Sequence, residues 1–175
     1  MPMQESPLQL IQTTPVAAIP PAFRREHRAV DTGDSPLSSV KDRLDRRQFE
    51  TMQAAFQMHG GFAKAQEMVR HLQPHWDDPW STLANWTMSR SVLVVTWLGQ
   101  TQVPMFQFDL GDMSLRSACA RVAGELKPVF DDWELALWFA TPNIWLHDAT
   151  PVDMLGVDAF AVVQAARTDR FIARG

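Results

Sequence analysis

Residues 133–171 read WELALWFATPNIWLHDATPVDMLGVDAFAVVQAARTDRF, and this stretch decides the fold. Aromatic and apolar residues fill 133–140 at helical spacing, and residues 141–143 (Thr-Pro-Asn) end that helix. Residues 150–151 (Thr-Pro) have the types favoured at a helix N-cap and first helical position, and an apolar helix follows over 157–170. The stretch is nearly free of catalytic residue types, which indicates a packed docking module rather than an active site.

The composition fits one globular domain or a small pair of domains. The chain has 175 residues, of which 46% are hydrophobic, and its seven Trp and ten Phe are ample for a sizeable core. A net charge of −4 excludes a global basic field of the kind that attracts nucleic acid. Residues 109–175 carry ten acids and six bases, so this part favours a neutral or basic partner.

Cysteine usage and apolar run lengths exclude several classes of protein. The single cysteine, Cys119, excludes an internal disulfide and a Cys-based zinc site, and its alanine neighbours indicate a small core residue. No apolar run approaches the ~20 residues of a membrane span. The first 20 residues lack the basic start of a signal peptide. We therefore expect a cytoplasmic protein that does not contact a membrane.

Six prolines in the first 36 residues predict a mobile, Pro-rich arm over 1–36. Within it, Arg24, Arg25 and Arg28 form a basic cluster. The cluster is either a set of solvated linker charges or a basic arm that contacts phosphate or acidic side chains of a partner.

After the predicted arm, apolar residues recur at helical spacing. The pattern predicts a helix from Ser38 that Gly60 and Gly61 end, and a second helix over 63–72. A third helix is expected over 79–90, with Asp78 as N-cap and proline at its first position.

The hydrophobic period then changes to two. Residues 92–98 are β-branched and aromatic, Gly99 begins a turn, and 102–108 form the return strand of a hairpin. Pro104 lacks an N–H group and predicts an edge position for that strand. Further along, Ser114 is expected to cap a helix over 115–126.

The sequence offers only weakly supported candidates for catalytic or metal-binding residues. His71 and His75 are four residues apart, but Pro74 breaks the helix that would align them. Asp131 is better explained as an N-cap in a capping box with Glu134. No Gly-rich phosphate loop and no nucleophile elbow occurs. We therefore predict a protein that is not an enzyme, with no cofactor and no metal site.

Two short helices followed by a hairpin have the outline of a winged helix-turn-helix. In that geometry the second helix enters the DNA major groove. Its polar contacts would be Ser81, Thr82, Asn85 and Arg90. Only one of these is basic, whereas phosphate neutralisation normally needs several Lys or Arg residues, so we expect weak DNA binding. The alternative is a structural helix-plus-hairpin that binds nothing.

Three short motifs occur in a fixed order along the C-terminal half. Residues 104–109 read PMFQFD, residues 138–143 read WFATPN, and Leu146 precedes TPVDML at residues 150–155. In this order the motifs resemble the Xre/MbcA/ParS toxin-binding domain, the C-terminal part of many bacterial type II antitoxins. The similarity covers about residues 86–172. Residues 147–149 (His-Asp-Ala) stand where that family usually has a Gly-rich connector.

The resemblance implies a small helical module that forms a homodimer and holds a toxin, often a RES-type enzyme that degrades NAD. A DNA-binding helix-turn-helix used for autorepression commonly precedes the module in such proteins. The resemblance and the loop position together give these expected toxin-binding residues: Trp138, Asn143, Trp145, His147 and Asp153.

The expected fold is mainly α with one small β-hairpin. A degenerate winged helix-turn-helix-like region over 37–108 follows the arm, and a small helical toxin-binding domain spans 109–175. Trp133, Trp138, Phe139 and Trp145 exceed what so short a segment needs for its own core, which suits interface anchors, although all four could instead be core residues. The alternatives to an antitoxin are a structural or regulatory helical protein that kept this fold and a winged transcriptional regulator.

Overall fold

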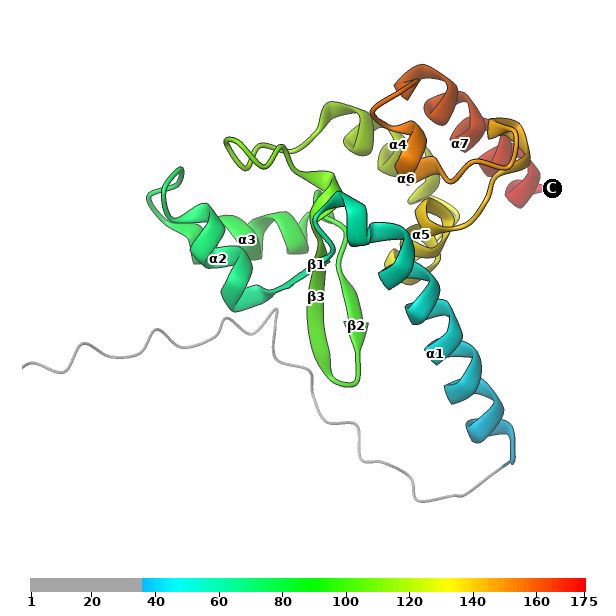
Figure 1. Ribbon diagram of the computed structural model, residues 1–175, viewed down its shortest axis with the longest axis horizontal. Helices are drawn as coiled ribbons and strands as arrows, with labels where there is room; N and C mark the ends of the chain where they lie inside the picture. Colours follow the sequence, from blue (N-terminus) through cyan, green and yellow to red (C-terminus); the bar gives the residue numbers. More distant parts are fainter. Residues whose placement is uncertain (1–35) are drawn as a thin grey trace, which may run out of the picture.

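A computed structural model describes residues 36–175, which form mostly helices and one small antiparallel sheet (Figure 1). The prediction of a mainly α fold is confirmed. The predicted arm lies outside the described residues, apart from Pro36, which begins the first helix.

The helices of this part of the chain are α1 (Pro36–Phe56), α2 (Ala65–Leu72), α3 (Pro79–Met88), α4 (Ser117–Leu126), α5 (Asp132–Ala140), α6 (Pro151–Met154) and α7 (Ala159–Arg174). Short 3-10 helices are η2 (Gln57–His59), η3 (Met105–Gln107) and η4 (Ile144–Leu146). The strands are β1 (Phe62–Lys64), β2 (Val95–Trp97) and β3 (Gln100–Pro104).

The sheet has three strands in the order β1-β3-β2, so the prediction that the return strand lies at an edge is wrong. β3 is central, and Pro104 is its last residue, opposite Phe62 of β1. A proline is tolerated there because it interrupts the ladder only at its end. The sequence did not predict β1 because three residues are too few to show a period of two.

Gly60 allows the chain to enter β1 close to the end of β3. Its φ is 92°, in the left-handed region that glycine adopts readily, and a Cβ there would lie 2.9 Å from Cβ of Met105. The N–H of Met105 donates to the carbonyl of Gly61 at 2.9 Å. The glycine pair thus ends the first helical segment and also permits close approach of two backbones.

The core consists of two apolar clusters, and α2 and α3 lie on the other side of the sheet from α1 and α5 (Figure 1). The smaller cluster joins α2 and α3 to the sheet through Met68, Leu72, Leu83, Val103 and Phe108. The larger cluster joins α1 and the sheet to α4–α7. Its members include Phe49, Phe56, Phe106, Leu135, Phe139 and Val162. This core therefore draws residues from both sides of the boundary predicted at residue 108.

Local signals predicted the N-caps of α3, α5 and α6 correctly. Asp131 and Glu134 form the expected capping box of α5, and Asp78 caps α3 by accepting from the N–H of Ser81 at 3.1 Å. The expected start of α4 at residue 115 is wrong. Leu115 instead forms a bridge with Phe108, and the helix begins at Ser117.

Candidate partner-binding site

The carboxylate of Asp169 on α7 gathers three of the five residues predicted to bind a toxin. Its Oδ2 accepts hydrogen bonds of 2.8 Å from Nε1 of Trp138 and from Nδ2 of Asn143. Its Oδ1 accepts a bond of 2.8 Å from Nε1 of Trp145. One acid thus ties the end of α5, the following loop and η4 to the last helix.

Asn143 organises the loop between α5 and α6. Its Oδ1 accepts from the N–H of Trp145 at 2.9 Å, which caps η4. Its backbone carbonyl accepts from Leu146 and Asp148, and its N–H donates to Ala149 at 3.1 Å. The side chain is buried, so every polar atom needs a partner, and each has one. The loop therefore has a fixed shape.

Two large apolar side chains of this loop, Ile144 and Trp145, are exposed. The side chain of Ile144 is 75% exposed and that of Trp145 is 48% exposed, whereas Trp138 is buried. About half of the surface of Trp145 faces solvent, so it is not a core residue. Its indole N–H is nevertheless hydrogen-bonded to Asp169, which holds the side chain in one orientation. Exposed aromatic side chains that are held in one orientation are suited to act as interface anchors.

His147 and Asp148 turn the chain from η4 towards α6. Their φ angles are 57° and 62°, so both lie in the left-handed region, in which non-glycine residues are uncommon. The structure thus has left-handed backbone at the place where the resembled family has a Gly-rich connector. The side chain of His147 is exposed and does not join the Asp169 cluster.

Asp153 lies outside the Asp169 cluster, on α6. Its Oδ1 pairs with Nε2 of His59 at 2.8 Å, and its Oδ2 accepts from the Thr150 hydroxyl at 2.5 Å. The Thr150 hydroxyl, followed by the His59 ring, holds the pKa of the Asp153 carboxyl below its usual value. Asp153 therefore links α6 to the end of the first helical segment.

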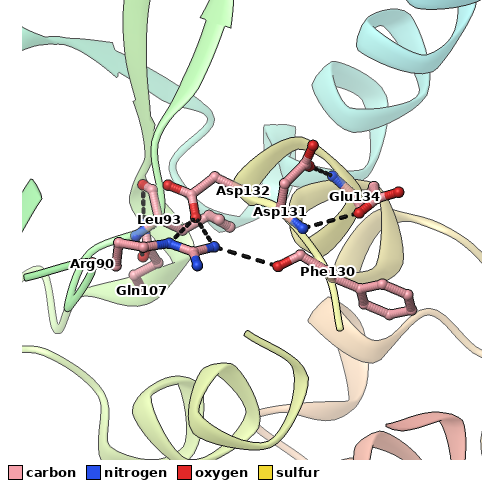
Figure 2. Close-up of polar contacts among 7 residues, drawn as sticks. All are labelled: Arg90, Leu93, Gln107, Phe130, Asp131, Asp132 and Glu134. Carbon is pink, nitrogen blue, oxygen red and sulfur yellow. Dashed lines mark hydrogen bonds and ion pairs between the residues drawn. The ribbon is translucent and has the colours of Figure 1, made fainter. Parts of the chain in front are cut away.

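The predicted DNA-binding residues are divided between two environments. Ser81 and Asn85 are exposed on α3, and the hydroxyl of Thr82 donates to the carbonyl of Asp78 within the helix. Arg90 instead points towards α5 (Figure 2). Its Nη2 and Nε donate to Oδ1 of Asp132 at 2.6 and 3.0 Å. Its guanidinium is therefore engaged within the protein.

Gln107 has a structural role that the sequence alone did not indicate (Figure 2). The side chain is buried, and its Oε1 accepts from the N–H of Leu93 at 2.6 Å. Its Nε2 donates to the carbonyl of Leu93 at 3.0 Å and to that of Pro104 at 2.9 Å. Gln107 thus completes the backbone hydrogen bonds of the segment that leads into β2.

Asp169 was also missed at the sequence level. It lies 26 residues from Asn143 and 31 from Trp138, and no spacing rule connects such distant positions. The only available signal was its sequence environment, since Asp169 is the one acid within a helix whose other charged residues are basic.

The described residues contain no group of three or more His, Cys, Asp or Glu side chains that could hold a metal ion. Burial raises the pKa of the Cys119 thiol to about 12, so almost none of the nucleophilic thiolate is present at neutral pH. None of the helices in residues 36–175 combines the length and the apolar character that crossing a bilayer requires.

Comparison of the chain with protein-family models, with curated proteins and with solved structures finds no match.

Proposed function

We propose that this chain is a non-enzymatic, antitoxin-like protein that neutralises a toxin by binding and occluding it. The observation that carries the proposal is the exposed apolar pair Ile144 and Trp145, whose loop is held by Asn143 and Asp169. Exposed apolar side chains on a loop that is held by hydrogen bonds lose little conformational entropy on binding, which favours a protein partner. The proposed function includes the association of two copies of the chain into a homodimer.

The proposed partner class comes from the three ordered motifs. They resemble those of proteins that hold RES-type toxins, enzymes that degrade NAD. The left-handed backbone at His147 and Asp148 supports this assignment, because glycine is the residue that most readily adopts such angles. The loop can thus keep the shape of a Gly-rich connector without its glycines.

Growth rescue tests the proposal. The reading frame next to the gene is expressed in a bacterial host, and arrested growth with falling NAD would identify its product as a RES-type toxin. We expect co-expression of the full chain to restore growth and NAD. The Trp145→Ala variant should fail to do so at equal soluble abundance.

A matched tryptophan provides the control for this experiment. Trp76 is 39% exposed and stacks edge-on against Trp86, away from the Asp169 cluster. Trp76→Ala should rescue growth as well as the unaltered chain does. Equal rescue by Trp145→Ala, or no rescue by the unaltered chain, would contradict the proposal and favour a structural or regulatory role.

DNA binding is a second candidate function, favoured by the order of the elements around the sheet. A strand precedes α2 and pairs with β3, and the β2–β3 hairpin follows α3. Ser81 and Asn85 are exposed on α3, as contacts to DNA bases require. Titration of labelled operator-region DNA at several salt concentrations tests this function, and we expect weak binding with a shallow salt dependence.

A further inference from the structure

We propose that two copies of this chain associate through their α7 helices, packed antiparallel, with Phe171 of each copy beside Phe160 of the other. This inference identifies the surface for the self-association that is part of the proposed function. The α7 dimer is tested on the purified chain alone, whereas neutralisation of a toxin is measured by growth rescue. A failure of the dimer proposal can therefore be distinguished from a failure of the proposed function.

The outer face of α7 carries an unusual aromatic pair. Phe160, Gln164, Arg167 and Phe171 follow one another at intervals of four, three and four residues, which places them along one side of the helix. Phe160 is 69% exposed and Phe171 is 78% exposed, while the opposite side of the helix is buried in the larger core. Two exposed phenylalanines on one helix face indicate a surface that another protein covers.

A groove lies beside Phe160, between α4 and α7, which pack together. Its volume is about 320 Å³. The lining residues are Arg121, Gly124, Glu125, Phe160, Val163, Gln164 and Arg167. A Cβ added at Gly124 would meet no atom within 4 Å, so the groove is open there. The groove therefore has room for a large side chain next to Phe160.

The spacing along α7 makes this face complementary to itself. A twofold axis between residues 165 and 166 reverses the order of positions, so Phe160 meets Phe171 of the second copy. The same operation places Gln164 opposite Arg167, an amide oxygen beside a guanidinium. A surface that matches its own copy under a twofold rotation is what a symmetric dimer requires.

Charge favours the antiparallel arrangement over the parallel one. Asp158 is the N-cap of α7, and Arg174 is in its last turn. Antiparallel packing brings Arg174 of one copy towards Asp158 of the other, whereas parallel packing would bring like charges together. Glu125 pairs with Arg167 at 2.7 Å and also with Arg170, which reduces the positive charge in the middle of the face. The two helix dipoles also oppose each other favourably.

Mass measurement of the full chain is the first test. Light scattering after size exclusion should give twice the 19.8 kDa of one chain. Phe171→Asp and Phe160→Asp should each return the mass to that of one chain, while the helical content measured by circular dichroism stays that of the unaltered chain. Leu98→Asp is the control, because Leu98 is 80% exposed on the β2–β3 hairpin, and this variant should remain dimeric. A monomeric unaltered chain, or dimeric Phe variants, would overturn the proposal.

Disulfide trapping tests the direction of packing. Chains that carry Phe160→Cys are mixed with differently tagged chains that carry Phe171→Cys, both in a Cys119→Ala background. One Phe160–Phe171 contact then remains, and oxidation should link the two kinds of chain. Each variant alone should not cross-link, because like positions lie about 16 Å apart along the helix, beyond the roughly 7 Å limit for a disulfide. Cross-linking of Phe160→Cys chains with themselves would indicate parallel packing and overturn the proposal.

Discussion

The indole Nε1 of Trp145 donates a 2.8 Å hydrogen bond to Oδ1 of Asp169, which lies 24 residues further along the chain. The other oxygen of the same carboxylate is bonded to Trp138 and Asn143. An exposed aromatic side chain is therefore connected to the last helix, α7, through one acid. The orientation of Trp145 is set before any partner arrives, so less rotational freedom is lost on binding.

Trp145→Ala should weaken binding of the proposed toxin by about 2 kcal/mol or more, the scale of an interface hot spot. It should lower the free energy of unfolding by only about 1 kcal/mol, because half of the side chain is already exposed and one hydrogen bond is lost. Calorimetric titration and urea unfolding measure the two effects. A loss of about 3–5 kcal/mol in stability would instead identify a core tryptophan.

Asp169→Asn should lower the free energy of unfolding by about 2 kcal/mol. The carboxylate accepts hydrogen bonds from three donors through its two oxygens, whereas an amide keeps only one acceptor oxygen and turns its NH2 group towards the remaining donor. At least one of the three donors therefore loses its partner and faces another N–H group. Thermal and urea unfolding measure the loss. Asp148→Asn is the control, since Asp148 is exposed, and asparagine tolerates its left-handed backbone. Equal stability of both variants would contradict a central role for Asp169.

The sequence predicted features that depend on neighbouring residues. Asp78 before Pro79 and Asp131 before Glu134 are local signals, and each caps a helix as expected. Features set by distant contacts were missed. β1 is a strand because β3 pairs with it, about 40 residues later, and Asp169 matters because the last helix returns to the loop after α5. No periodicity or spacing encodes such contacts.

His147→Val should lower the free energy of unfolding by about 1–2 kcal/mol, because a β-branched side chain resists a φ of 57°. His147→Gly should leave stability within about 0.5 kcal/mol of the unaltered chain, since relief of the left-handed backbone offsets the greater freedom of glycine in the unfolded state. Chemical unfolding of the two variants tests this backbone argument. Similar stabilities of the Val and Gly variants would refute it.

Arg90→Ala should lower stability by about 1 kcal/mol, because the half-exposed guanidinium is bonded to Asp132 and to the carbonyl of Phe130. The double variant with Asp132→Ala should show a coupling energy of about 0.5–1 kcal/mol. DNA titrations should give the same salt slope before and after the change, since this guanidinium is already paired. A smaller slope in Arg90→Ala would show that Arg90 contacts phosphate.

Gln107→Met should lower the free energy of unfolding by about 2–4 kcal/mol. Methionine has a similar length but cannot replace the three hydrogen bonds, so the N–H and carbonyl of Leu93 and the carbonyl of Pro104 lose their side-chain partner in a buried place. Gln100→Met is the control, because Gln100 is exposed at the start of β3. This variant should differ from the unaltered chain by less than about 0.5 kcal/mol in the free energy of unfolding. Partner affinity per folded molecule should be unchanged in both variants, because Gln107 is buried and cannot contact a partner directly. A stable Gln107→Met variant with weakened binding would show instead that the PMFQFD motif, residues 104–109, forms part of the partner interface.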